Sequence, residues 1–255
     1  MGLFGLNKAK KQAQTPSYAA QRRNILNQNS SFFVRESYKS LRTNIRFFQT
    51  EEGCRRFCIT SSLPGEGKSI TLLNLAITFA EAGQRVLLID ADMRRPSQAR
   101  LLIERATPGL SNVLAGHCTE EEAVRKNVYP NLDVLFSGEI PPNPSELLGS
   151  PRMKKMIERL SEAYDYILVD APPVGLVTDA CLIAKLLDGM LFLVRQNKTE
   201  KDDLSRCLQQ IKNAGVRLMG FVINGYQGDG GSQYKYNYRS KNKYSYESLN
   251  KPGRE

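Results

Sequence analysis

The chain has 255 residues, 41% of them hydrophobic, and its formal net charge at pH 7 is +10. This length can bury the core of one substantial domain but not comfortably of two. The single histidine, and five cysteines that form no C-x-x-C pair, argue against a structural zinc site and against a Ser–His or Cys–His catalytic pair.

The chain opens with a polar segment. Residues 1–30 carry five basic side chains, no acidic side chain and no hydrophobic periodicity, which predicts a flexible basic arm. From Glu36 to Phe48, apolar residues recur at helical spacing opposite a charged face. This pattern predicts an amphipathic helix.

Strands and helices then alternate as far as Asn224. Short apolar runs predict strands at 56–60, 85–90, 131–138, 166–170, 189–194 and 218–224. Helices are expected at 68–82, from about 144 toward 164, near 178–187 and at 200–214. The alternation predicts an α/β fold in which a parallel sheet is covered by helices on both faces.

After Asn224 the alternation stops, and the chain becomes rich in tyrosine. The tyrosines are interleaved with Lys, Arg, Ser and Asn: Tyr226, Tyr234, Tyr236, Tyr238, Tyr244 and Tyr246. We therefore expect an arm at 1–30, one domain at 31–225 and a flexible tail at 226–255. A basic excess of this kind suits nucleic acid, anionic lipid or an acidic protein surface, and the plainer alternative is a pair of solvated ends.

A glycine-rich loop joins the first expected strand to its helix. It contains Pro64, Gly65, Glu66, Gly67, Lys68, Ser69 and Ile70, which we expect to contact a nucleotide. Glycines there let consecutive N–H groups face one anion, at the positive end of a helix. Lys68 can reach the β and γ phosphates, and the Ser69 hydroxyl can hold Mg²⁺. The full P-loop pattern has glycine where this chain has Ser62, so an ordinary strand-to-helix turn is the alternative.

Two expected strands end in aspartate. Asp90 and Asp92 end the second strand and Asp170 ends the fourth, so all three should converge on the loop at the carboxyl edge of the sheet. We expect Ser69, Asp92 and Asp170 to hold Mg²⁺, and either Asp90 or Asp92 to accept a proton.

Further roles complete the expected site. Lys68 should neutralise charge on the phosphates, and Arg94 or Arg95 should steady the γ phosphate or the incoming chain. Asn224, at the end of the last strand, is a candidate for contact with adenine. Its alternative role is that of a residue in a strand-terminating turn.

Together, the loop, the sequence Asp90-Ala-Asp92-Met-Arg94 and the run Ile167–Asp170 followed by Ala-Pro-Pro resemble the bacterial tyrosine kinases. This family belongs to the MinD/ParA branch of P-loop proteins, and the resemblance covers residues 31–246. It implies a MinD/ParA-like P-loop NTPase fold, ATP and Mg²⁺ as cofactors, and ATP-dependent phosphorylation of protein tyrosines. It also implies autophosphorylation of the tyrosine-rich tail and regulation of capsular or extracellular polysaccharide synthesis and export.

The resemblance also implies partners. The family's oligomerisation motif, E-x-x-R-x-x-R, falls on Glu36, Lys39 and Arg42, which implies a homo-oligomeric ring. Lys39 stands where the family has arginine and cannot form a bidentate fork. Further partners are a membrane adaptor of the polysaccharide co-polymerase type, protein tyrosine substrates and a cognate tyrosine phosphatase, and no nucleic acid is expected.

The expected location follows from what the sequence lacks. No apolar run approaches the roughly 18 residues of a membrane span, and no apolar signal-peptide core is seen at the N-terminus. We expect a cytoplasmic protein held at the inner face of the membrane by the adaptor, as in the two-component form of the family from Gram-positive bacteria.

Two other functions stay open. A ParA/MinD-type ATPase would share the fold and the metal chemistry, but such proteins usually carry an early P-loop lysine where this chain has Leu63. A non-catalytic, nucleotide-dependent scaffold would bind ATP through the same loop.

Overall fold

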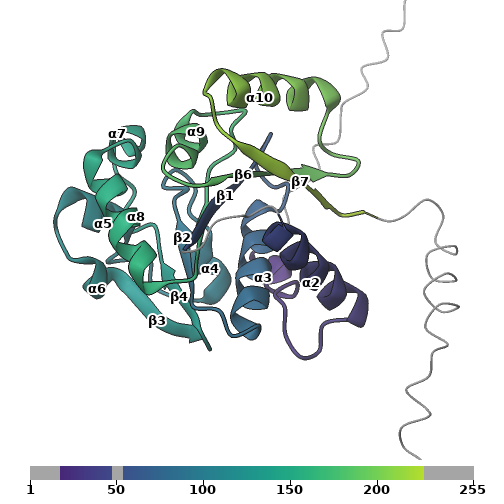
Figure 1. Ribbon diagram of the computed structural model, residues 1–255, viewed down its shortest axis with the longest axis horizontal. Coiled ribbons are helices and arrows are strands. Elements are labelled where there is room, and N and C mark those ends of the chain that lie inside the picture. The colour runs from purple at the N-terminus through teal and green to yellow at the C-terminus, as the bar shows by residue number, and fades with distance from the viewer. Residues whose placement is uncertain (1–17, 48–53, 227–255) are drawn as a thin grey trace, which may run out of the picture. The chain divides into compact units, whose positions relative to one another are not determined.

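The computed structural model describes residues 18–47 and 54–226 (Figure 1). Within these ranges one sheet has the strand order β3-β4-β2-β5-β1-β6-β7. Its strands are β1 (Arg55–Ser61), β2 (Val86–Asp90), β3 (Val124–Tyr129), β4 (Leu132–Leu135), β5 (Tyr166–Asp170), β6 (Gly189–Arg195) and β7 (Leu218–Asn224). All pairings are parallel except β3 with β4. The predicted α/β fold is confirmed.

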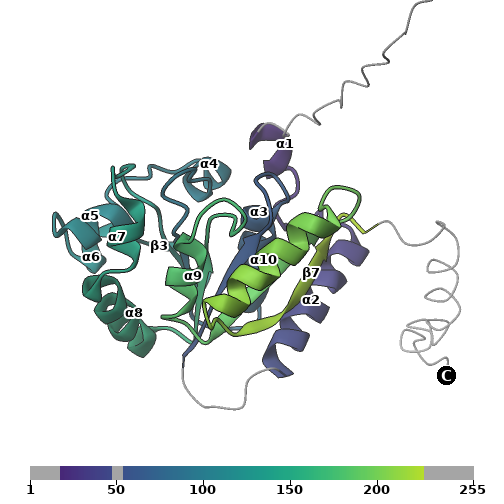
Figure 2. The same cartoon turned by 90° about the horizontal axis from the view of Figure 1, so that it is seen from above.

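Helices cover both faces of this sheet (Figures 1 and 2). They are α1 (Tyr18–Arg22), α2 (Phe32–Phe47), α3 (Lys68–Glu81), α4 (Gln98–Leu102), α5 (Leu110–Ala115), α6 (Glu120–Ala123), α7 (Pro144–Leu148), α8 (Pro151–Ala163), α9 (Asp179–Ala184) and α10 (Lys201–Asn213). One core packs α3 and Ile45 of α2 onto the sheet, and a second core on the opposite face packs α5, α8 and α9. Because both faces are covered, β2 and β5 are buried along their whole length and read as unbroken apolar runs.

The antiparallel edge strand β3 is absent from the sequence prediction. Its sequence VRKNVY is half-exposed and charged, so it lacks the apolar run that marks the central strands. The prediction was also wrong in making one helix of 144–164. Two helices form there instead, with Gly149 and Ser150 between them. The Ser150 hydroxyl caps the start of α8 by accepting a hydrogen bond from the Met153 N–H at 3.2 Å.

The N-terminal boundary also differs from the expectation. Ile25 and Leu26 are buried, the Leu26 N–H donates to Asn74 Oδ1 at 2.9 Å, and the Asn74 amide donates to the Asn24 carbonyl at 2.8 Å. The expectation of a flexible arm is therefore wrong for residues 18–30, whose short apolar segment packs against the middle of α3. Residues 1–17 lie outside the described ranges. The compact unit ends at Asn224, and the tail beyond Tyr226 is also outside the described residues.

Among the helices in the described ranges, none is both long enough and apolar enough to cross a membrane.

Candidate active site

The glycine-rich loop lies between the carboxyl end of β1 and the N-terminus of α3, which begins at Lys68. Gly65 and Gly67 have positive φ angles of 74° and 102°, a region that side chains disfavour. A Cβ on Gly67 would also lie 2.2 Å from Asn224 Nδ2. Both constraints require glycine at position 67, as the motif predicts.

The loop is clamped by residues far away in the sequence. The Asn224 amide donates to the Glu66 carbonyl at 2.7 Å, and Lys198 Nζ donates to the Gly65 carbonyl at 2.9 Å. The buried Glu66 carboxylate accepts from the Leu63 N–H at 3.0 Å and from the Thr199 hydroxyl. Sequence reasoning missed Lys198 and Thr199, which carry no motif. Asn224, expected to contact adenine, donates to the backbone of the loop, and its contact with adenine stays a prediction.

Lys68 lies between two buried carboxylates at the carboxyl edge of the sheet. Its Nζ is 3.0 Å from Asp92 Oδ2, 3.1 Å from Asp170 Oδ1 and 3.4 Å from Ser69 Oγ. Burial disfavours the charged lysine, but the charges of Asp170 and Asp92 outweigh that effect and raise the pKa of Lys68 above its ordinary value. The structure therefore brings Lys68, Ser69, Asp92 and Asp170 together, with the lysine charged.

Asp90 lies beside this cluster and is fully buried. Its Oδ2 accepts the backbone N–H groups of Ser97 at 3.0 Å and Gln98 at 2.9 Å. Burial first, and the nearby charge of Asp170 second, raise the pKa of Asp90 to about 7. A carboxyl group in that range can both take up and release a proton near neutral pH.

Gln98 is a site residue that sequence reasoning missed. Its side-chain amide donates to Asp170 Oδ2 at 2.9 Å and to the Ser69 carbonyl at 3.1 Å. It thereby fixes the orientation of Asp170 relative to the helix that carries Ser69. Its only sequence signal is its place eight residues after Asp90, which no motif records.

The polar atoms of the site fit a magnesium ion that is shared with a phosphate. Buried oxygens beside this cluster without a hydrogen-bond partner include Asp90 Oδ1, Ser97 Oγ and Gln98 Oε1, and such oxygens call for a ligand or water. Within the described ranges, no group of three or more His, Cys, Asp or Glu side chains could hold a metal alone. Mg²⁺ commonly binds through one or two carboxylates together with substrate phosphates, which matches Asp92 and Asp170.

Arg94 does not join Lys68 in this structure. Its Nε donates to Asp179 Oδ2 at 2.8 Å and its Nη2 donates to Ser145 Oγ at 2.9 Å, while the Ser145 hydroxyl donates to Asp179 Oδ1 at 2.6 Å. The arginine thus ties the segment after β2 to α7 and α9. Arg95 contributes its backbone N–H, 3.0 Å from Asp92 Oδ1.

The residues expected to mediate oligomerisation lie on α2, which packs against α3 (Figure 2). Lys39 and Glu36 pair with each other at 2.8 Å, and Arg42 Nη1 donates to the Thr78 carbonyl of α3 at 2.6 Å. Of the six tail tyrosines, the described residues include only Tyr226, whose side chain is exposed.

Comparisons with known proteins agree with this geometry. Residues 55–218 match a family model described as an AAA domain. The chain is 39% identical over 201 residues to Tyrosine-protein kinase YwqD of Bacillus subtilis, an alignment that covers 79% of this chain and 85% of that protein. The kinase domain of the Escherichia coli tyrosine kinase ETK superposes with a TM-score of 0.74 at 32% identity, covering 77% of this chain and 78% of that one.

A more distant structure confirms the predicted fold class. The MinD cell division protein of Aquifex aeolicus superposes with a TM-score of 0.56 at 23% identity, covering 73% of each chain. The fold is therefore shared between the kinases and the MinD-like P-loop proteins.

Proposed function

Because the chain belongs to the family of bacterial tyrosine-protein kinases, we propose that it transfers the γ-phosphoryl group of ATP to protein tyrosines. The observation that carries this proposal is the convergence of Lys68, Asp92 and Asp170 beside a glycine-rich loop at a helix N-terminus. This arrangement supplies the positioning and the charge neutralisation that phosphoryl transfer requires.

Nucleotide binding is assigned to the loop. Backbone N–H groups from Gly65 to Ser69 are proposed to surround the β phosphate at the positive end of α3. Lys68 would leave the carboxylates and pair with the phosphates, since both are anionic partners for the same charge. Ser69, Asp92 and Asp170 would hold Mg²⁺, which would neutralise charge on the phosphate oxygens when bound.

Proton removal from the substrate is assigned to Asp90. A tyrosine hydroxyl with a pKa of about 10 is protonated at neutral pH and benefits from a nearby base. The free Oδ1 of Asp90 and its raised pKa of about 7 support Asp90 over Asp92, whose carboxylate is engaged by Lys68. The proton would pass from the tyrosine oxygen to Asp90 as that oxygen bonds phosphorus and ADP leaves.

We assign the kinase further roles from its family. Its substrates would include its own tail tyrosines, with a tyrosine phosphatase reversing the modification. It would regulate capsular or extracellular polysaccharide synthesis and export. A membrane adaptor of the polysaccharide co-polymerase type would hold it at the inner face of the membrane, and copies would assemble through Glu36, Lys39 and Arg42.

The test is to incubate the purified chain with Mg-ATP and to analyse the tail by mass spectrometry. Phosphotyrosine on the tail is the expected result, and it should disappear when the six tail tyrosines are replaced by phenylalanine. Release of free phosphate without phosphotyrosine would instead indicate a ParA/MinD-type ATPase. Nucleotide binding with neither product would indicate a scaffold.

A further inference from the structure

A basic hollow lies between α1, α4 and the start of β3, outside the site described above. Four arginines line it: Arg22, Arg100, Arg105 and Arg125. In the part of the chain that the structure describes, none of these guanidinium groups forms an ion pair with Asp or Glu. With four arginines and one glutamate on its lining, the hollow therefore carries net positive charge, which favours an anionic ligand.

Two of these arginines are fixed in place by uncharged partners. Arg125 Nη2 donates to the Thr107 carbonyl at 2.9 Å, and Arg100 Nε donates to the Pro96 carbonyl at 3.1 Å. The Arg100 guanidinium also lies 4.4 Å from the centre of the Tyr18 ring. These contacts orient the side chains but leave their charge available. Planar guanidinium groups held in this way suit the paired oxygens of a phosphate.

The size and lining of the hollow favour a phosphate that is carried by an aromatic ring. Its volume of about 710 Å³ falls in the range of small-ligand sites. The Tyr18 ring contributes an aromatic surface, and Ile103, with 76% of its surface exposed, contributes an apolar one. A free phosphate would make no use of either surface, whereas a phosphorylated tyrosine would use both.

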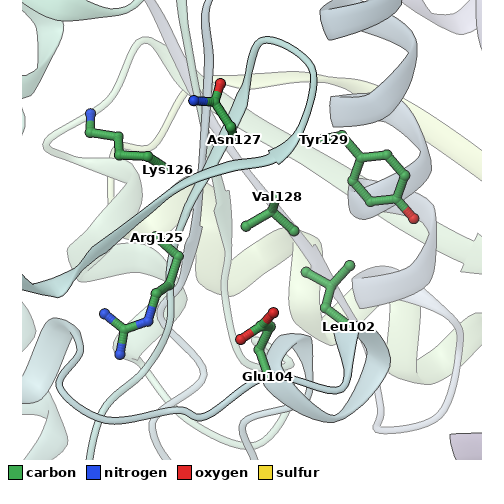
Figure 3. Close-up of a pocket in the computed structure, with 7 residues that line it drawn as sticks. All are labelled: Leu102, Glu104, Arg125, Lys126, Asn127, Val128 and Tyr129. Atoms are coloured by element: carbon green, nitrogen blue, oxygen red, sulfur yellow. The ribbon is translucent and has the colours of Figure 1, made fainter.

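One acidic residue, Glu104, also lines the hollow. Figure 3 shows the adjoining cavity, where the Glu104 carboxylate lies between Arg125 and Leu102. A carboxylate at this rim would repel a bare anion but would attract a basic residue next to it. The tail sequence Tyr234-Lys235-Tyr236 places a lysine beside each of two tyrosines, and such a peptide would satisfy both charges.

We propose that this hollow recognises a phosphorylated tyrosine in a peptide that also carries a lysine or arginine next to it. That this kinase itself produces such a peptide depends on the proposed function, whereas the recognition of the peptide depends only on the residues that line the hollow. The hollow is also close to the site that would make phosphotyrosine. The short helix α4 begins at Gln98, which contacts Asp170, and its other end leads to Ile103 and Glu104 on the wall of the hollow.

The test measures the binding of a fluorescent peptide with the sequence of residues 232–240, phosphorylated on Tyr236. The protein is the full chain, treated with a tyrosine phosphatase and assayed in EDTA without nucleotide, so that no kinase reaction is needed. Comparison ligands are the same peptide without phosphate, a version with phosphoserine at position 236, and vesicles containing anionic lipid. The variant Arg22→Gln/Arg105→Gln is matched by Arg23→Gln/Lys155→Gln, which removes two exposed charges that do not line the hollow.

We expect the phosphotyrosine peptide to bind more tightly than either comparison peptide, and Arg22→Gln/Arg105→Gln to weaken it by about tenfold or more. The matched variant should change the affinity by less than about twofold. Equal binding of all three peptides, or equal weakening by both double variants, would overturn the proposal. So would binding of the vesicles, but not the peptide, that depends on Arg22 and Arg105. A chain that binds the peptide but makes no phosphotyrosine with Mg-ATP would fail only the proposed function.

Discussion

The carboxyl edge of the sheet and helix α2 both carry charged residues that sequence motifs mark as functional, yet their surroundings differ. At the sheet edge, Lys68 and its partners Asp92 and Asp170 are more than nine-tenths buried. On α2, the Lys39–Glu36 pair has side chains 49% and 34% exposed. The buried charges are held by one another across the fold, whereas the exposed pair is held only by its own helix.

This difference shows which motif residues are brought into contact by the folding of one chain alone. Adjacent parallel strands end at the same edge, so β2 and β5 bring Asp92 and Asp170 to Lys68 without any help from another molecule. On α2, the side chains of Glu36 and Lys39 pair with each other, while Arg42 reaches the Thr78 carbonyl of α3, so none of these three residues contacts the cluster at the sheet edge. The same substitution should therefore have very different effects in the two regions.

Replacing a lysine by methionine should give the largest contrast. Lys68→Met leaves two buried carboxylates without their cation, so we expect the free energy of unfolding to fall by about 3–5 kcal/mol in EDTA. Phosphoryl transfer should fall by on the order of 10³-fold. Lys39→Met breaks only an exposed pair and should change stability by less than about 0.5 kcal/mol.

Denaturant unfolding and a phosphotyrosine assay measure both effects. Added Mg²⁺ should restore part of the stability that Lys68→Met loses, because the ion replaces the missing positive charge. Equal stability of the two variants in EDTA would contradict the account of the buried cluster.

Neutralising one carboxylate sharpens the same comparison. Asp92→Asn keeps the volume but removes charge from the proposed metal site, so activity should fall by about 10²-fold or more and depend on higher Mg²⁺ concentrations. Glu36→Gln, made at the exposed pair, should leave the Mg²⁺ dependence unchanged. An Asp92→Asn protein with the normal Mg²⁺ dependence would remove Asp92 from the metal site.

A substitution of Gln98 tests whether a buried residue that only orients Asp170 also contributes to Mg²⁺ binding. Gln98→Leu removes the amide that holds Asp170 and the Ser69 carbonyl, and we expect the apparent Mg²⁺ affinity to fall by about 10–100-fold. Gln209→Leu on α10, which loses only an exposed bond to Asn213, is the matched control. Identical Mg²⁺ titrations for the two variants would show that Gln98 has a packing role and does not orient Asp170 for the metal.

The smallest effects are expected on α2. Arg42→Ala removes the hydrogen bond to the Thr78 carbonyl and should lower stability by about 1 kcal/mol. Glu36→Ala combined with Lys39→Ala should change stability by less than about 0.5 kcal/mol but weaken self-association. Light scattering that shows an unchanged assembly in the double variant would place the interface elsewhere.

The contrast between the sheet edge and α2 also explains which features could be predicted from the sequence. Lys68, Asp92 and Asp170 were predictable, because their meeting follows from one loop motif and from the ends of parallel strands. Gln98 reaches Asp170, and Thr199 reaches Glu66, only through the packed fold, so neither carries a local signal. The charged edge strand β3 was missed for a similar reason, since its pairing with β4 defines it.

One missed feature did have a local signal. Ser150 followed by Pro151 is a common start of a helix, and it separates α7 from α8. The role of Arg94 could not be read in this way, because the sequence does not show that Asp179 and Ser145 lie within reach of its guanidinium group.

The most direct test of the central claim mixes two complementary variants. Lys68→Met keeps the tail tyrosines but lacks the lysine that we propose to be catalytic, whereas a chain with phenylalanine at the six tail positions keeps the lysine but lacks those tyrosines. Asp92→Asn serves as a second inactive acceptor if Lys68→Met is poorly folded. After incubation with Mg-ATP, mass spectrometry should find phosphotyrosine on the tail of the inactive acceptor in the mixture and none when that acceptor is incubated alone. Phosphotyrosine on the Lys68→Met tail in the absence of the other chain would contradict the assignment of phosphoryl transfer to the Lys68 site.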